Sequence, residues 1–594
     1  MKHDNHMEQE LKQHISAALT QLFGIENPTV VIEPTRIEFE GDFTFVVFPY
    51  LKQSKKGPEQ TANDIGTYLQ QHLSQIDSFN VIKGFLNLVI YKQYWVDFVA
   101  QHYRNAQYGF ATPKSKEKVL VEYSSPNTNK PLHLGHVRNN LLGFSVSNIL
   151  KANGYDVVMC NLVNDRGIHI CKSMYAWMQH GKGETPQSSG MKGDHLVGKY
   201  YVAFDKVFKA EQKELVAAGM SEEEAEKKSP SILAAQELLR KWEAGDTETV
   251  DVWKTMNGWV YDGFDVSYKS LGVSFDQFYY ESNTYLLGKE IVQEGLGKNV
   301  FFKKDDGSVW VDLTADGLDQ KLLLRGDGTS VYITQDIGTA ELKYKDFGAE
   351  RSIYVVGNEQ DYHFKVLQLI CEKLGKSYAK GIYHLSYGMV ELPHGKMKSR
   401  EGTVVDADDL VAEMIQAAED TTKALGKTDG FAETELQELY QTIGLGALKY
   451  FLLKVDPRKK MLFNPEESID FQGNTGPFIQ YTYARIKSIL RNSGATDVGE
   501  TNGVVPNYLE NKLIQTLYQY PTVIADAGKD LSPGLVANYV YDLAKSFSHF
   551  YHECSIIKEE NKATRNLRLQ LCMMTAHTIQ SAFSLLGINV PERM

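Results

Sequence analysis

The sequence predicts an α/β protein built around a doubly wound parallel sheet, with a small α/β domain before it and an α-helical bundle after it. Three observations indicate this arrangement. From Val119 onward, short apolar runs that suit buried parallel strands alternate with helical patterns. Before that point, the chain carries strand-like runs and helices of its own. After Gly426 the strand signals fade, and helical periodicity dominates to the end.

Composition sets broad limits on what the protein can be. A chain of 594 residues with 42% hydrophobic residues is long enough for several domains with sizeable cores. The five cysteines are scattered without a C-x-x-C pair, so neither a structural zinc site nor a disulfide framework is expected. The N-terminus is polar and no apolar run is long enough to span a bilayer, so we expect a cytoplasmic protein with no membrane partner. A net charge of −12 argues against a general nucleic-acid coat, but it allows RNA binding through local basic patches.

The pattern of residues 1–112 predicts the small α/β domain. A helical pattern at the start is followed by short apolar runs that are separated by turns, and a polar segment containing Pro113 then suggests a linker. The expected elements are strands at 29–33, 36–40, 43–48 and 81–90, a helix at 58–73, and the linker at 103–118.

The most informative stretch is 119–143, which reads VLVEYSSPNTNKPLHLGHVRNNLLG. An apolar strand leads through a polar loop to a helix whose first N–H groups are unpaired and attract phosphates. Gly135 lets a ligand approach the backbone closely, and the flanking His133 and His136 can donate hydrogen bonds to phosphate oxygens. This arrangement suits a reaction without a protein nucleophile, in which ATP is positioned and charge on its α-phosphate is stabilised.

The alternation of strands and helices continues beyond this stretch. Polar clusters directly follow two of the later strands, which is where α/β sheets bind ligands. Tyr332 and Asp336 are four residues apart and share one face if a helix begins there. The expected elements are a strand at 155–163 with a turn at 164–167, an insertion at 181–246, a hairpin at 300–313, a return of the α/β pattern at 325–336, strands at 353–356 and 384–392, the polar cluster 357–364 and the basic loop 395–402.

The motif E-Y-S-S-P-N-x-N-K-P-x-H-x-G-H-x-R-N resembles the first signature of class I aminoacyl-tRNA synthetases, in the version of the arginyl-tRNA synthetases. The basic loop, G-K-M-K-S-R-E-G, resembles their second signature, K-M-S-K-S, whose cations meet the triphosphate as pyrophosphate leaves. Ser399 stands where the second lysine is usual, and Lys130 is placed as in family members that lack that lysine. The resemblance therefore assigns the compensation of phosphate charge to Lys130, Lys396 and Arg400.

The resemblance extends over essentially the whole chain. It implies a small N-terminal domain at 1–112 that contacts the outer corner of tRNA, through its G-D-F and K-G-F-L-N elements. It also implies a Rossmann-type catalytic domain at 113–430 with insertions within about 181–325, and a helical anticodon-binding domain at 431–594. In the turn at 164–167, Asp165 matches an acidic residue that helps to hold the active site, and Arg166 stands where Trp is common.

The implied activity is arginine–tRNA ligation, with ATP, L-arginine and tRNA(Arg) as partners and Mg²⁺ accompanying ATP. The enzyme would be a monomer, and no metal would be bound by the protein itself. A guanidinium is planar, always charged and has five donors, so its site should offer carboxylates and other acceptors. By resemblance, the ATP-binding residues are His133, Gly135, His136, Gly357, Met389, Val390 and Lys396, and the arginine-binding residues are Glu122, Asn127, Tyr332, Asp336 and Gln360.

Two other functions stay open at this point. One is a class I synthetase for a different amino acid, although Glu122 and Asp336 argue against apolar substrates and the lack of Cys/His zinc spacing argues against cysteine. The other is a non-catalytic, tRNA-binding relative. The intact signature histidines and Lys396 argue against it, and only the altered second lysine supports it.

Overall fold

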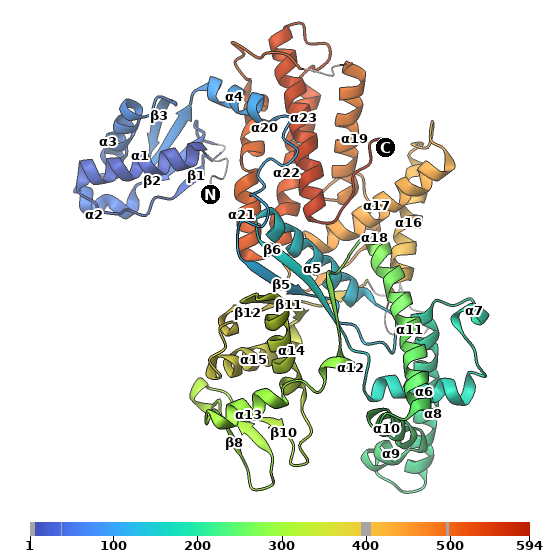
Figure 1. Ribbon diagram of the computed structural model, residues 1–594. Helices are drawn as coiled ribbons and strands as arrows, with labels where there is room; N and C mark the ends of the chain where they lie inside the picture. The colour runs from blue at the N-terminus through green and yellow to red at the C-terminus, as the bar shows by residue number, and fades with distance from the viewer. Residues whose placement is uncertain (1–5, 37, 394–404, 495–497) are drawn as a thin grey trace.

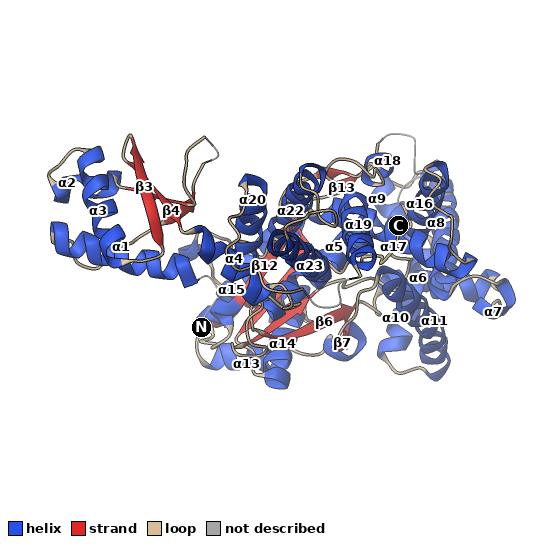
Figure 2. Cartoon of the chain, turned by 90° about the horizontal axis from the view of Figure 1, so that it is seen from above, coloured by secondary structure: helices blue, strands red, loops and turns tan. Residues whose placement is uncertain are grey.

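The computed structural model describes residues 6–36, 38–393, 405–494 and 498–594. Its centre is a parallel sheet covered by helices, and the long helices of the C-terminal part stand beside that sheet (Figure 1). A small module with its own sheet lies at one end of the molecule, and the helices of residues 168–271 lie at the other (Figure 2). The predicted architecture of a small α/β unit, a doubly wound sheet and a helical bundle is confirmed.

The central sheet has five parallel strands in the order β12-β11-β5-β6-β7. The chain starts in the middle at β5, moves outward to β6 and β7, and then returns to the other side of β5 for β11 and β12. This reversal between β5 and β11 creates a switch point, where α/β sheets bind ligands at the carboxyl ends of their strands. The strands are β5 (Lys118–Glu122), β6 (Asp156–Val163), β7 (Gln277–Tyr280), β11 (Arg351–Gly357) and β12 (Ile382–Tyr387).

Alternate residues of β5 face two different helices. Val119 and Val121 pack with Leu142 and Val146 of α5 (Leu134–Ala152). Leu120 lies on the opposite face, in a cluster that includes residues from α14 (Tyr332–Phe347). Burial on both faces explains why the strand reads as a continuous apolar run. Helix α15 (Asp361–Lys373) connects β11 to β12.

The N-terminal module contains an antiparallel sheet in the order β1-β2-β4-β3. The strand expected at 36–40 is wrong, because Phe39 N–H bonds to the Arg36 carbonyl in a turn. The strand expected at 81–90 is instead the end of β3 and all of β4, joined by a turn in which Lys83 and Gly84 have positive φ. The elements are α1 (His6–Phe23), β1 (Ile32–Pro34), β2 (Phe43–Val46), α2 (Leu51–Ser54), α3 (Pro58–His72), β3 (Ile76–Ile82), β4 (Phe85–Ile90) and α4 (Lys92–His102).

The segment between β6 and α14 contains a helical part, strand β7 of the central sheet, and a small β part. The hairpin expected at 300–313 is present as β8 and β9, and a third antiparallel strand, β10, joins it. Residues 325–336 form a turn and the start of α14. The other elements are α6 (Ile168–His180), α7 (Pro186–Ser189), α8 (Gly193–Ala217), α9 (Glu222–Lys228), α10 (Pro230–Glu243), α11 (Thr247–Leu271), α12 (Glu281–Thr284), α13 (Lys289–Gly297), β8 (Phe301–Lys303), β9 (Val309–Val311) and β10 (Lys321–Leu324).

The C-terminal part is a helical bundle that packs against α5. Ser145 of α5 donates a hydrogen bond to the Leu585 carbonyl at the end of the last helix. The strand expected at 384–392 ends early at Tyr387, and a short strand β13 (Val390–Glu391) pairs in parallel with β14 (Met461–Leu462). Within the described residues, no helix is both long and apolar enough to cross a bilayer. The helices are α16 (Ala407–Ala424), α17 (Glu433–Leu453), α18 (Pro465–Ser468), α19 (Gly476–Ser493), α20 (Tyr508–Tyr518), α21 (Tyr520–Asp530), α22 (Pro533–Glu553) and α23 (Lys562–Leu585).

Candidate functional site

The two histidines of the first signature cap the N-terminus of α5 with their own side chains. Nδ1 of His133 accepts a hydrogen bond from the Gly135 N–H at 3.1 Å, and Nδ1 of His136 accepts one from the His133 N–H at 3.2 Å. Their ring centroids are 3.9 Å apart. Because each Nδ1 is an acceptor, each neutral ring carries its proton on Nε2, and no described residue forms a hydrogen bond with either Nε2.

The surroundings of both imidazoles favour the neutral form. Burial, and then the nearby Lys130 ammonium, lower the pKa of His133 to about 4. Burial, His133 and Lys130 hold the pKa of His136 well below its usual value. A side chain in place of Gly135 would displace the His133 ring, because a Cβ at this position would lie 2.9 Å from Cε1 of His133. The helix start therefore presents two neutral Nε2–H donors beside one lysine.

Arg138 and Asn139 follow the histidines on α5, and their side chains bond to the backbone of neighbouring segments. The sequence alone did not indicate this role. The Asn139 side chain accepts from the Ser124 N–H at 2.6 Å and donates to the Val355 carbonyl at 2.7 Å, so it ties the signature loop to β11. Arg138 is buried and donates to the carbonyls of Gly388 at 2.5 Å and Lys459 at 3.0 Å. Burial lowers its pKa to about 10.

Of the other residues expected to bind ATP, three lie near the ends of β11 and β12. Gly357 is the last residue of β11, and a Cβ there would meet the Glu359 carboxylate at 2.4 Å. Met389 and Val390 follow the Gly388 that Arg138 holds, with Met389 exposed and Val390 half-buried. Lys396 and Arg400 lie outside the described residues.

The chain that follows residues 394–404 lies directly beside the first signature. The Leu134 N–H bonds to the Val405 carbonyl at 3.0 Å, and the Ala407 N–H bonds to the Leu132 carbonyl at 2.9 Å. His133 and Asp406 are therefore paired as an antiparallel bridge. The structure thus places residues 405–407, which follow the second signature in the chain, beside the histidine pair.

Glu122, expected to meet a guanidinium, already has a cationic partner in the protein. Its carboxylate forms a buried ion pair with Lys343 of α14. Burial disfavours a charged Lys343, but the Glu122 carboxylate holds its pKa above the usual value. The Lys343 Nζ also lies 4.6 Å from the ring centroid of Tyr354. Glu122 and Asp336 therefore differ in their surroundings. The charge of Glu122 is neutralised by Lys343 inside the fold, whereas Asp336 lies near the surface.

The remaining residues expected to bind arginine are accessible. Tyr332 begins α14 with 75% of its surface exposed, and Asp336 lies one turn later and bonds to Nε2 of His363 at 2.5 Å. Asn127 is exposed and pairs with Asn164, and Gln360 is exposed in the short turn before α15.

Glu281 is a further acidic residue in this region that sequence reasoning missed. It begins α12, a short helix that packs against α14. Burial raises the pKa of Glu281 to about 7; Arg166 opposes this rise, and the carboxylates of Asp165 and Asp336 add to it. No pattern in a single sequence marks Glu281, because the fold rather than the spacing brings α12 next to α14.

The turn that holds Asp165 is tightly fixed. The buried Asp165 carboxylate accepts hydrogen bonds from Tyr261 Oη at 2.7 Å and from Ser282 N–H at 2.8 Å. Arg166 packs on an aromatic ring: its guanidinium carbon lies 4.0 Å from the ring centroid of Tyr285. It also bonds to the Glu243 carboxylate at 2.5 Å.

Family models account for nearly the whole chain. The description "tRNA synthetases class I (R), catalytic domain" matches residues 99–464, "Arginyl tRNA synthetase N terminal domain" matches 9–90, and "DALR anticodon binding domain" matches 479–594. The chain belongs to the arginyl-tRNA synthetase family. Curated bacterial members of this family are similar over their full lengths. The arginine–tRNA ligase of Bacteroides fragilis strain YCH46 is 57% identical and that of Flavobacterium psychrophilum is 56% identical, each across 99% of this chain and 100% of the relative.

Solved arginyl-tRNA synthetase structures share the fold at lower identity. The Thermus thermophilus enzyme superposes with a TM-score of 0.81 at 22% identity, covering 99% of this chain and 100% of the other. The Plasmodium falciparum enzyme gives a TM-score of 0.77 at 19% identity, with 99% of each chain covered.

Proposed function

We propose that this member of the arginyl-tRNA synthetase family is an arginine–tRNA ligase. L-arginine and ATP react to give arginyl-adenylate and pyrophosphate, and the arginyl group then passes to the 2′-hydroxyl of the 3′-terminal adenosine of tRNA(Arg). The observation that carries this proposal is the pair of neutral Nε2–H donors at the start of α5, at the switch point of the sheet.

In the first step the arginine carboxylate oxygen attacks the α-phosphorus, and the bond to pyrophosphate breaks. No protein nucleophile is needed, so the protein positions the reactants and stabilises the developing charge. His133 and His136 donate their Nε2–H groups to phosphate oxygens, while Gly135 leaves room for ATP. Lys130, Lys396 and Arg400 compensate the charge of the phosphates, and Mg²⁺ accompanies ATP.

The guanidinium is proposed to bind at the acidic region around Asp336. The Asp336 carboxylate is one of the groups that raise the pKa of Glu281 on the neighbouring α12, and Tyr332 adds a hydroxyl from the same face of α14 as Asp336. Glu122 has Lys343 as its cation, so it contributes as an acceptor of hydrogen bonds rather than as the main counter-charge. Asn127 and Gln360 are proposed to hold the α-amino end.

The flanking regions are proposed to bind tRNA. Residues 1–112 would contact its outer corner, 113–430 would form the catalytic domain, and 431–594 would bind the anticodon. Tyr481 supports the last assignment, because its ring lies 3.4 Å from the Lys427 ammonium and 4.7 Å from the Arg485 guanidinium. Such aromatics beside cations can stack bases and attract phosphates. As part of protein synthesis, the enzyme is proposed to work as a monomer in the cytoplasm.

The proposal is tested by ATP–pyrophosphate exchange with each of the twenty amino acids, with and without total tRNA. Exchange with arginine alone that appears only when tRNA is present is expected. Exchange with arginine in the absence of tRNA would support arginine as the substrate, but it would refute the dependence of the reaction on tRNA. A folded protein that binds tRNA but shows no exchange would instead be a non-catalytic relative.

A further inference from the structure

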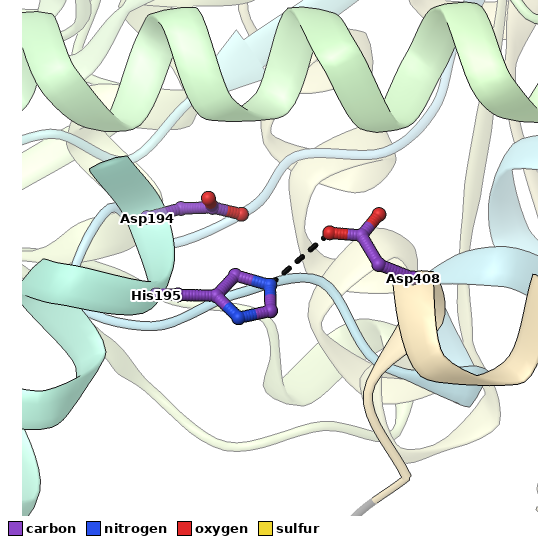
Figure 3. A group of neighbouring side chains, drawn as sticks. All are labelled: Asp194, His195 and Asp408. Carbon is purple, nitrogen blue, oxygen red and sulfur yellow. Dashed lines mark hydrogen bonds and ion pairs between the residues drawn. The ribbon is translucent and has the colours of Figure 1, made fainter. Parts of the chain in front are cut away.

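A network of charged side chains joins the inserted helix α8 to the start of α16. Nε2 of His195 lies 3.1 Å from the Asp408 carboxylate, and Ser267 of α11 donates to the same carboxylate at 2.8 Å. Lys192 forms an ion pair with Asp408 and lies 3.2 Å from the carboxylate of Asp194. Figure 3 shows Asp194 and His195 on one helix facing Asp408 on the other.

This network supplies its own cations. Lys192 lies between the carboxylates of Asp194 and Asp408, in the place where a metal ion would otherwise offset their charge. The hydrogen bond to Asp408 raises the pKa of His195 above its usual value, against the effect of burial, with Asp194 and Asp406 adding to the rise. We therefore infer that the cluster holds α8 against the start of α16 and does not bind a metal ion.

The segment on the α16 side of the network leads directly to the catalytic histidine. Asp406 lies 3.4 Å from Nε2 of His195, and its carboxylate accepts the Asp408 N–H at 2.8 Å to cap α16. The backbone of the same segment bonds to Leu132 and Leu134 on either side of His133. Residues 405–408 are thus held by the network on one side and hold His133 on the other.

Helix α8 also contacts the first-signature loop directly. Gly198 packs so closely under Pro131 that a Cβ at position 198 would lie 2.8 Å from the proline ring. The neighbouring Lys130 Cα would be 3.6 Å from that Cβ. One inserted helix therefore supports the segment around His133 at two points, through Gly198 and through the charged network.

We propose that Lys192, His195 and Asp408 are positioning residues, which set the place of His133 for adenylate formation by fixing residues 405–408 against the first signature. This inference rests on the proposed role of His133 toward ATP. It gives the inserted helices α8 and α11 a part in the first reaction step, although neither contributes to the signatures.

The test is a double-mutant cycle measured by arginine-dependent ATP–pyrophosphate exchange in the presence of tRNA. Asp408→Asn removes one charge from the network and is expected to lower kcat by about 10- to 100-fold, since small displacements of catalytic groups cost rates of this size. Asp409→Asn is the matched control, because it makes the same change at the next, exposed position. It should leave kcat unchanged.

The cycle separates positioning from a structural role. If Asp408 acts through His133, Asp408→Asn should have less than about a threefold effect in a His133→Ala background, since residues that act as a unit are not additive. Equal losses in both backgrounds would overturn the proposal, and so would a His133→Ala enzyme with unchanged kcat. Thermal unfolding and tRNA binding show whether each variant is folded.

A milder variant keeps the proposal testable if Asp408→Asn does not fold. His195→Gln leaves the Lys192–Asp408 ion pair in place and should lower kcat in the same direction, with a smaller loss in the His133→Ala background. Unchanged kcat in His195→Gln would then overturn the proposal. Failure of the proposed function would look different, because the unaltered protein would itself show no arginine-dependent exchange.

Discussion

Glu122, the last residue of the central strand β5, forms a buried ion pair with Lys343 of α14. This pair joins the sheet to the helix that carries Tyr332 and Asp336 at its other end. Removing one partner of a buried pair leaves an uncompensated charge and costs about 3–5 kcal/mol. Lys343→Met should lower the free energy of unfolding by this amount in urea denaturation.

The matched control for Lys343→Met is Lys345→Met, which removes an exposed lysine of the same helix. It should change the free energy of unfolding by less than about 1 kcal/mol. The double variant Glu122→Gln/Lys343→Met should recover much of the loss, because no buried charge is left unpaired. A Lys343→Met protein as stable as the control would contradict the ion pair.

Asp336 is expected to determine the affinity for arginine. Hydrogen bonds to charged groups are worth about 1.5–3 kcal/mol, so Asp336→Asn should raise the KM for arginine by about 10- to 100-fold. The KM for ATP should change by less than twofold. Asp319→Asn, at an exposed position, is the control. Steady-state exchange at varied arginine and varied ATP measures both values, and equal increases would rule out a specific contact with the guanidinium.

Stability should fall as the pH is lowered, because His133 is held neutral in the folded protein. Its folded pKa of about 4 lies below the unfolded value of about 6.5, so the unfolded state binds more protons between these values. The free energy of unfolding should therefore decrease from about pH 6.5 down to about pH 4, with a slope of about 1.4 kcal/mol per pH unit for one such histidine. His133→Gln should make this slope shallower in urea titrations at each pH, and an unchanged slope would show that His133 does not contribute.

Arg166 should be replaceable by the Trp that is common in the family. Its guanidinium stacks on Tyr285, and a cation over an aromatic ring is worth about 0.5–2 kcal/mol. Arg166→Ala should lower the free energy of unfolding by about that amount, whereas Arg166→Trp should keep most of it through ring packing. Glu243→Gln tests the ion pair alone and should cost less than about 1 kcal/mol because Glu243 is exposed. A Trp variant as unstable as the Ala variant would contradict this interpretation.

The sequence predicted the parts of the fold that depend on local periodicity. The buried strand at Val119–Val121 and the helix after His133 follow from apolar patterns, and the hairpin at 300–313 follows from its turn residues. The strand expected at 36–40 failed because alternating residues there lie in a turn, which periodicity alone does not distinguish from a short strand.

The partners of the site residues could not be predicted from the sequence. Lys343 and Glu122 are 221 positions apart and meet only because β5 and α14 pack together. Glu281 and the network around Asp408 likewise depend on how separate helices pack. The motif indicated that His133 and His136 act on phosphates, but the fold was needed to show which ring nitrogen is available.

The central proposal is that the paired histidines bind the phosphates of ATP and the acidic region binds arginine, so that the protein charges tRNA(Arg) with arginine. The most direct test is the charging of total tRNA with each of the twenty labelled amino acids in turn, with ATP present. The predicted result is acid-precipitable label with arginine alone, and its loss when Asp336 is replaced by Asn at low arginine concentration. Charging with a different amino acid, or none with any of the twenty by folded protein, would contradict the proposal.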